Sequence, residues 1–234
     1  MPADAPQTLL IDADDTLWEN NVYFERAIAE FISYLNHQSL SREEVRAVLN
    51  QVERQAILEH GYGSHSFAHA LVKTFEQLSA EPVTPARHDF IWGFAHRIAD
   101  YPIEIIAGVP ETLEYLSKHG HHLVLTTKGN ITEQTGKVER SGLKEFFAAV
   151  EIVAEKNAGT YRGIVAKYEL DPRATWMVGN SPRSDINPAL AAGINAVFVP
   201  HDQTWVLEHE EVDSAPEGAR LLEVCRFRDL QQHF

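Results

Sequence analysis

The chain has 234 residues, 44% of them hydrophobic and 23% charged, a composition typical of a globular protein with one sizeable core and room for an inserted domain. Its formal net charge of −14 argues against nucleic acid as a partner, because a phosphate backbone needs a positive protein surface. No apolar run approaches the roughly 20 residues of a membrane span, and residues 1–6 lack the basic flank and apolar stretch of a secretory signal.

In chain order, short apolar runs that stop at polar or turn-forming residues predict five buried strands, at 8–11, 122–127, 148–153, 174–178 and 196–199. Amphipathic segments predict helices at about 109–119, 130–141, 158–169 and 184–192. Strands that alternate with helices after short turns indicate a Rossmann-like, doubly wound, mostly parallel α/β sheet.

The segment after the first strand does not continue this alternation of strands and helices, and its pattern predicts several helices. Ser41 and Glu44 have the spacing of a capping box, and Phe31, Tyr34 and Leu35 recur at helical spacing. We therefore expect an all-helical cap domain at 18–105, inserted over the carboxyl end of the first strand. The catalytic core would comprise residues 1–17 and 106–234.

The first strand ends at an acidic loop, where ligands of parallel sheets bind. Asp12 and Asp14 are two residues apart, so a continued strand would place both carboxylates on one face. Their repulsion should raise one pKa unless a cation is present. One carboxylate is then suited to attack phosphorus, and the more readily protonated one to donate a proton to the leaving group. A structural capping role is the alternative for this motif by itself.

Three other strand ends carry polar residues. Thr127 is followed by Lys128 and Gly129, where a hydroxyl and free backbone N–H groups would hold phosphate oxygens. Lys156 follows the third strand and would offset negative charge. Residues 179–185 follow the fourth and offer oxygen ligands for a metal ion. Each of these polar groups could have an ordinary structural role by itself. Together with the acidic loop, however, they place polar residues on four successive strand ends at one sheet edge, which chance explains poorly.

These motifs resemble the haloacid dehalogenase-like superfamily, whose members are mostly phosphohydrolases with an aspartyl-phosphate intermediate. The resemblance covers roughly residues 7–17 and 106–200, and the inserted helices look like the family's cap. The matching positions are Asp12, Asp14 and Thr16 for the first motif, Thr127 in preference to Thr126 for the second, Lys156 for the third, and Asn180 with Asp185 for the fourth. Gln134 and Lys137 fit the spacing after the second motif.

The resemblance implies that Asp12 is the nucleophile and Asp14 the general acid and base. One Mg2+ would be held by Asp12, the Asp14 backbone carbonyl and Asp185, with help from Asn180, and Thr127 and Lys156 would hold the phosphate and nucleophile. The family usually has Asp at position 180, so we expect weakened or retuned metal binding. Further substrate contacts are expected from Thr16, Lys128, Gly129, Arg183 and, in the cap, Tyr62.

Three alternatives remain open. A 2-haloacid dehalogenase shares the family, but its members lack an acidic residue at the position of Asp14. A phosphosugar mutase shares all four motifs, and a catalytically silent binding or regulatory module shares the fold. His65 and His69 have a spacing compatible with zinc on a helix, but no third ligand is evident in the sequence.

The expected substrate is a small phosphorylated metabolite, with no nucleic-acid or membrane partner, acted on by a monomer or homodimer. The single cysteine, Cys225, excludes an internal disulfide, and its apolar neighbours favour a buried thiol. Together with the lack of a signal, this leads us to expect a cytoplasmic location.

Overall fold

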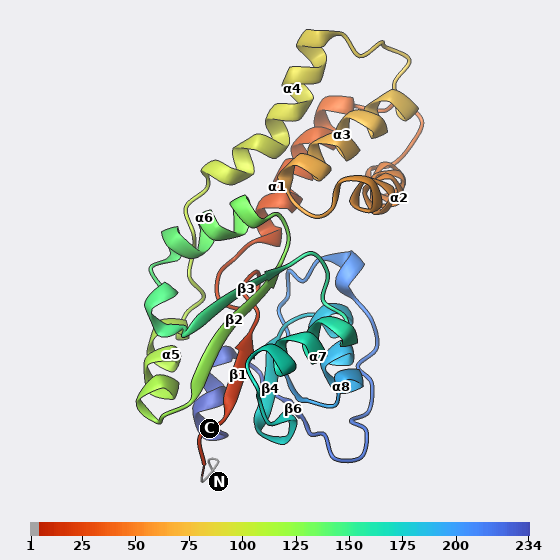
Figure 1. Cartoon of the computed structure of the whole chain (residues 1–234). Coiled ribbons are helices and arrows are strands. Elements are labelled where there is room, and N and C mark those ends of the chain that lie inside the picture. Colours follow the sequence, from red (N-terminus) through yellow and green to blue (C-terminus); the bar gives the residue numbers. More distant parts are fainter. Residues whose placement is uncertain (1–4) are drawn as a thin grey trace. The chain divides into compact units, whose positions relative to one another are not determined.

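The computed structural model describes residues 5–234 (Figure 1), so residues 1–4, which belong to the stretch read above as lacking a secretory signal, lie outside the described part. The chain forms two compact units. The first comprises residues up to Glu19 together with Ile103–Phe234, and the second comprises Asn20–Pro102. The sequence analysis placed the first division at 17/18, two residues earlier than in the structure. It placed the second at 105/106, three residues later.

The first unit contains a six-stranded, all-parallel sheet with the strand order β3-β2-β1-β4-β5-β6. The strands are β1 (Thr8–Ile11), β2 (His122–Lys128), β3 (Ala149–Val153), β4 (Thr175–Gly179), β5 (Asn195–Phe198) and β6 (Leu221–Glu223). This confirms the Rossmann-like fold class. The sequence analysis missed β6, because three partly exposed residues at a sheet edge give no apolar run.

Helices cover both faces of this sheet. They are α5 (Val109–Lys118), α6 (Ile131–Ser141), α7 (Ala158–Lys167) and α8 (Asn187–Ala192), with short turns η2 (Lys144–Phe146), η3 (Pro172–Ala174), η4 (Pro182–Ile186), η5 (Val206–Glu208) and η6 (Phe227–Gln232). Successive β1 residues point to opposite faces: Leu9 and Ile11 pack with α5 and α6, whereas Leu10 packs with α7 and α8. Two buried cores therefore fix the position of β1, which leads directly into the acidic loop.

The second unit is all-helical. It contains α1 (Asn21–Leu35), α2 (Arg42–His60), α3 (Ser64–Leu78), α4 (Pro85–His96) and the short η1 (Arg97–Asp100). The expected capping box is present: the Ser41 hydroxyl accepts from the Glu44 N–H, and the Glu44 carboxylate accepts from the Ser41 N–H. Phe31, Phe67 and Phe94 contribute to a separate core, so this unit has its own hydrophobic interior.

Trp18 explains why the units divide after Glu19. Its side chain is fully buried in the core of the first unit, and its backbone forms isolated bridges with Asp14 and Ile105. The segment that leads into the second unit and the segment that returns from it are therefore paired with each other inside the first unit. No helix in residues 5–234 is both long and apolar enough to cross a membrane.

Candidate active site

The carboxyl ends of four neighbouring strands in the first unit carry the predicted polar residues. β1 leads into Asp12, β2 contains Thr127, β3 is followed by Lys156, and β4 is followed by Asp185. The Asp12 N–H still donates to the Val178 carbonyl of β4 at 2.9 Å. The sheet thus holds the backbone at Asp12 and fixes where its side chain begins.

Lys156 joins two carboxylates that are far apart in the sequence. Its Nζ atom lies 2.5 Å from Asp12 Oδ1 and 2.7 Å from Asp185 Oδ1, and all three side chains are buried. The sequence analysis expected these groups to converge, and the structure brings them together around a single ammonium. A buried cation between two carboxylates offsets the cost of removing them from water.

Burial sets the electrostatics of this trio. Desolvation, together with the nearby charges of Asp185 and Asp14, raises the pKa of Asp12 to about 7, although Lys156 opposes the rise. Burial by itself would lower the pKa of Lys156, but Asp12 and Asp185 outweigh it and raise that pKa, so the ammonium stays charged. A further positive charge would therefore stabilise the ionised form of Asp12 at neutral pH.

Thr16 and Asn180 lie next to the second carboxylate oxygen of Asp12, the one that Lys156 does not contact. The Thr16 hydroxyl lies 2.9 Å from Asp12 Oδ2 and 3.2 Å from Asn180 Oδ1, and its single proton serves one acceptor at a time. The Asn180 amide nitrogen donates to Thr204 Oγ1 at 2.8 Å. Sequence reasoning missed Thr204, since it lies between β5 and β6 in a segment without a motif.

Asp14 is held by donors from the first unit. Lys137 Nζ lies 2.9 Å from both of its oxygens, Gln134 Nε2 donates at 2.9 Å and Trp18 Nε1 donates at 2.7 Å. Burial acts to raise the pKa of Asp14, but the charge of Lys137 and the hydrogen bonds from Gln134, Lys137 and Trp18 together outweigh it and lower that pKa. The sequence analysis expected the second carboxylate to be the more readily protonated; instead the pKa rises at Asp12 and falls at Asp14.

Two adjacent threonines, Thr126 and Thr127, precede the last residue of β2, and both are buried. Thr126 Oγ1 has no hydrogen-bond partner among the described residues. Because side chains alternate along a strand, Thr126 and Thr127 leave opposite faces of the sheet. Thr127 is paired in register with Ile152 of β3, which places it at the carboxyl edge beside the third motif.

Lys128 and Gly129 are engaged within the protein. Lys128 Nζ lies 2.6 Å from Glu208 Oε1 and 2.7 Å from Ser184 Oγ. The Gly129 N–H donates to the Val153 carbonyl at 3.0 Å, so it is not the free donor that the sequence analysis expected. Gly129 has φ +138°, and a Cβ there would meet Gln134 at 3.1 Å, so glycine lets Gln134 reach Asp14.

Asp185 is presented by the π-helical turn η4. Its Oδ2 atom accepts from the Ser181 N–H at 3.0 Å, which leaves Oδ1 for Lys156. A Cβ on Gly179 would lie 2.2 Å from Asp185 Oδ2, so only glycine lets this carboxylate lie against the end of β4. Such π turns occur frequently at functional sites.

The other predicted contacts are distributed over both units. The exposed Arg183 donates to the Leu207 carbonyl at 3.3 Å. Tyr62 lies in the turn between α2 and α3 of the second unit, and its expected substrate contact stays a prediction. His65 and His69 lie on α3, where the His69 ring stacks on His60 and the remaining contacts of the two rings, with each other, His60 and Trp92, are edge-to-face.

The donor set beside Asp12 suits Mg2+. Hard divalent cations prefer carboxylate and carbonyl oxygens, and Asp12, Asp185 and Asn180 offer such oxygens close together. The raised pKa of the buried Asp12 is a physical reason for a cation at this place. These residues therefore fit the metal that the sequence analysis expected.

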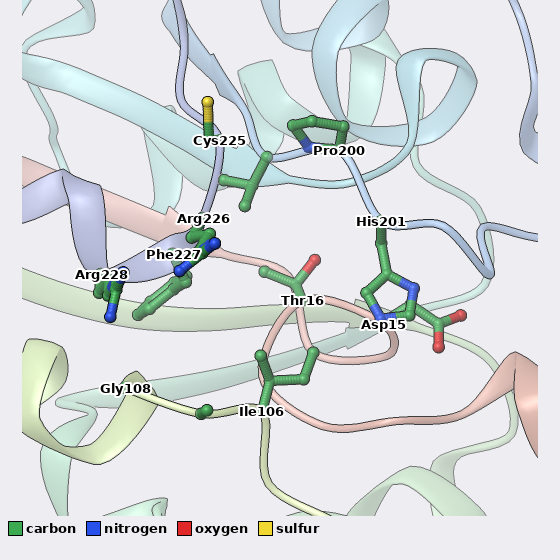
Figure 2. A pocket seen from close by; sticks show the side chains of 12 residues that line it. Asp15, Thr16, Ile106, Gly108, Pro200, His201, Cys225, Arg226, Phe227 and Arg228 are labelled. Carbon is green, nitrogen blue, oxygen red and sulfur yellow. The ribbon is translucent and has the colours of Figure 1, made fainter.

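A cavity of about 350 Å3 lies beside this site in the first unit (Figure 2). It is lined by Thr16 and Asp15 of the acidic loop, by Pro200 and His201 after β5, and by residues of the segment after β6 that include Cys225. Cys225 is exposed, which corrects the expectation of a buried thiol. Its neighbours Val224 and Phe227 point into the core, so the thiol takes the outward position.

Comparison with known proteins identifies the family. The pattern of the haloacid dehalogenase-like hydrolases matches residues 9–199. The chain belongs to the haloacid dehalogenase-like hydrolase family. The match spans the sheet edge from Asp12 to Asp185, so the geometry described above is that of a hydrolase of this family. The comparison with curated proteins finds no match.

Solved structures agree with the fold. A haloacid dehalogenase-like family hydrolase from Xanthomonas campestris is 28% identical with a TM-score of 0.81, and the alignment covers 98% of this chain and 95% of that one. A predicted phosphoglycolate phosphatase from Haemophilus somnus is 16% identical (TM-score 0.64; coverage 97% and 97%). The L-2-haloacid dehalogenase from Xanthobacter autotrophicus is 17% identical (TM-score 0.66; coverage 97% and 98%). The neighbours thus include both reaction types.

Proposed function

We propose that this hydrolase is a Mg2+-dependent phosphatase that cleaves a small phosphomonoester through an aspartyl phosphate on Asp12. The observation that carries the proposal is the position of Lys156 Nζ between Asp12 and Asp185, at 2.5 and 2.7 Å. This arrangement joins a nucleophilic carboxylate to a second carboxylate that is suited to a metal ion. The acidic residue at position 14 adds a group for proton transfer.

The proposed reaction has two steps. In the first, an Asp12 oxygen forms a bond to phosphorus while the bond to the leaving oxygen breaks, and Asp14 gives its proton to that oxygen. In the second, Asp14 takes a proton from water, whose oxygen attacks phosphorus and releases Asp12 and inorganic phosphate. Bound Mg2+ would neutralise charge on the phosphoryl group, and Asp12, the Asp14 carbonyl, Asn180 and Asp185 would hold it.

The pKa of Asp14 bears on the order of these events. Lys137 lowers it, so Asp14 rests in the ionised form that the second step requires. To act as the acid of the first step, Asp14 must gain a proton. We therefore place a weakening of the Lys137 contact before leaving-group protonation, when substrate is bound.

Asp14 also favours a phosphatase over a dehalogenase. A departing halide needs no proton, so a dehalogenase has no use for a carboxylate at this position. Among the neighbours, the predicted phosphatase and the dehalogenase share this fold at similar identity, and residue chemistry at the site must separate the two. A carboxylate at 14 together with Asp185 supports the phosphoryl reaction.

Substrate profiling with and without Mg2+ tests the proposal. A panel of a nucleoside monophosphate, phosphoglycolate, sugar phosphates and p-nitrophenyl phosphate should include at least one compound that releases phosphate only with Mg2+. Asp12→Asn should reduce this turnover on the order of 10,000-fold or more. Exposed Asp213→Asn, in the same unit, is the matched control and should retain it. Acid-quenched wild type should carry a hydroxylamine-sensitive acyl phosphate that Asp12→Asn lacks.

Other results would replace the proposal with a named rival. Metal-independent halide release from a 2-haloacid would identify a dehalogenase. Conversion of one phosphosugar into its isomer without net phosphate release would identify a mutase. Tight binding to a protein partner with no turnover would identify a silent module. We further propose that the enzyme acts in the cytoplasm as a monomer or homodimer, without nucleic-acid or membrane partners.

A further inference from the structure

A second group of metal-ligand side chains lies outside the proposed Mg2+ site. Asp15 and Glu19 follow β1, and His201 follows β5, yet one ligand atom of each lies within 4.8 Å of the others. Among residues 5–234 this is the one group of three or more such side chains that meets this spacing. Figure 2 shows the His201 ring beside the Asp15 carboxylate.

From this geometry we propose that Asp15, Glu19 and His201 bind a divalent transition metal of the zinc class. The proposal is independent of the phosphatase reaction, because none of the three side chains takes part in it. Two carboxylates and one imidazole are a ligand set that zinc-class ions accept, whereas Mg2+ and Ca2+ prefer oxygen alone. The imidazole therefore selects the class of ion.

The spacing of the donor atoms agrees with this ligand set. His201 Nε2 and Glu19 Oε1 are 3.4 Å apart. Two ligands bonded to zinc at about 2.1 Å with a tetrahedral angle between them are separated by roughly 3.4 Å. This pair is already at the separation that coordination requires, and a ligand oxygen of Asp15 lies within 4.8 Å of a ligand atom on each of the other two side chains.

Burial and charge favour a cation at the same place. Asp15 is buried, and the side chains of Glu19 and His201 are 27% and 17% exposed, so the group is partly shielded from water. Two shielded carboxylates this close repel each other, and a divalent ion would relieve the repulsion. Asp15 and His201 also line the cavity of about 350 Å3, which gives room for water as a further ligand.

Metal binding would change the proton on His201. The Gln203 N–H now lies 3.2 Å from Nδ1, so the neutral ring carries its proton on Nε2, facing Glu19. Coordination through Nε2 moves that proton to Nδ1 and ends the contact with Gln203. Gln203 lies in an exposed turn, so water can take over the hydrogen bond that the ring gives up.

Such an ion would connect two functional loops. The loop after β1 carries Asp12 and Asp14, and the loop after β5 leads to Thr204, which accepts a hydrogen bond from Asn180. The structure already joins these loops by the contact between Glu19 and His201 at 3.4 Å. A metal in place of that contact would hold the acidic loop more firmly.

Equilibrium dialysis of the whole protein against Zn2+ tests the proposal. Glu19→Gln and His201→Gln should each lose one equivalent of zinc, or weaken its binding by more than the roughly 10- to 100-fold that loss of an outer-shell partner causes. Asp202→Asn removes an exposed carboxylate from the same loop and should bind zinc like the wild type. Asp185→Asn removes the proposed Mg2+ ligand and His69→Gln alters the cap histidines, and both should keep this equivalent.

Thermal unfolding supplies an independent readout that includes a test of folding. Zinc should raise the Tm of the wild type and of Asp202→Asn, but not of Glu19→Gln or His201→Gln. Each variant should unfold cooperatively without zinc, which shows that lost binding is not lost folding. If either ligand variant binds zinc as tightly as the wild type, or if all bound zinc disappears with Asp185→Asn and His69→Gln, the trio is an ion pair only and the proposal is wrong.

Discussion

Lys137 Nζ lies 2.9 Å from both carboxylate oxygens of Asp14, so the residue proposed for proton transfer is held by a helix that follows another strand. The pair is largely buried, with side chains 17% and 21% exposed. A contact of this kind fixes the direction of the carboxylate as well as its charge. It makes Lys137 a positioning residue for Asp14.

Replacement of Lys137 should therefore impair turnover without removing the nucleophile. We expect Lys137→Met to lower kcat/KM by roughly 10- to 100-fold, less than the full range for loss of a general acid or base. Lys137→Arg should retain more activity because it keeps the charge. Lys118→Met, which removes a surface pair with Glu114, is the control. Equal activity of Lys137→Met and wild type would show that the contact has no part in catalysis.

Gly179 should control metal affinity through Asp185. A Cβ at position 179 would lie 2.2 Å from Asp185 Oδ2, so Gly179→Ala must displace that carboxylate. We expect a loss of roughly 1–3 kcal/mol in the free energy of unfolding, and an increase in the Mg2+ concentration that gives half-maximal activity. Gly163→Ala lies in α7 with open space around its Cβ, so it should leave the Mg2+ dependence unchanged and raise the free energy of unfolding by about 0.5–1 kcal/mol. Unchanged Mg2+ dependence in Gly179→Ala would separate Asp185 from the metal.

The two threonines of β2 provide a matched pair. Thr126 Oγ1 is buried without a partner in the described part of the chain, so Thr126→Val should leave activity unchanged and increase stability by up to about 1 kcal/mol. Thr127→Val should lower kcat/KM by roughly 10- to 100-fold, since it removes the hydroxyl proposed to hold a phosphate oxygen. Steady-state kinetics and urea unfolding of both variants check this. The opposite pattern would assign the phosphate contact to Thr126.

Asn180 leads to a gain-of-affinity prediction. Its oxygen lies near Thr16 Oγ1 and its nitrogen donates to Thr204, so Asn180→Asp keeps the first contact and adds a negative charge. We expect half-maximal activation at a Mg2+ concentration roughly 3- to 10-fold lower, which corresponds to about 1 kcal/mol. Asn180→Ala should require more Mg2+ than the wild type. If Asn180→Asp needs the same Mg2+ as Asn180→Ala, position 180 does not contribute to the metal site.

Glu53 of the cap should make stability depend on pH. Burial raises the pKa of this α2 residue from its ordinary 4.5 to about 7, which corresponds to roughly 3 kcal/mol. As the pH rises, Glu53 loses its proton at a higher pH in the folded state than in the unfolded state. The stability that this protonation contributes is therefore fully present below pH 4.5, falls as the pH rises, and is lost above about 7.

Urea unfolding at about pH 5 and about pH 8 checks the sign. Glu53→Gln should remove most of the decrease in the free energy of unfolding between the two pH values. It should also be more stable than the wild type at the higher pH. The exposed Glu76→Gln in α3 is the control and should keep the wild-type dependence. A decrease of equal size in Glu53→Gln would place its origin elsewhere.

Much of the fold follows from local patterns in the sequence. The apolar run of β1 ends at Asp12, and the segment from Ser41 carries its own capping signal, because strand and helix boundaries depend on neighbouring residues. The order of the polar strand ends was enough to predict that Asp12, Lys156 and Asp185 meet, since parallel strands share one carboxyl edge. Strand β6, which has no such pattern, was missed.

Tertiary structure alone decided how these groups contact one another. Lys156 reaches Asp12 across 144 positions and Lys137 reaches Asp14 across 123, distances at which spacing along the chain carries no geometric information. The distribution of charge reversed an expectation, because burial and a lysine from α6 together determine which carboxylate keeps its proton. The grouping of Asp15 and Glu19 with His201 likewise arises only because the loops after β1 and β5 meet at one sheet edge.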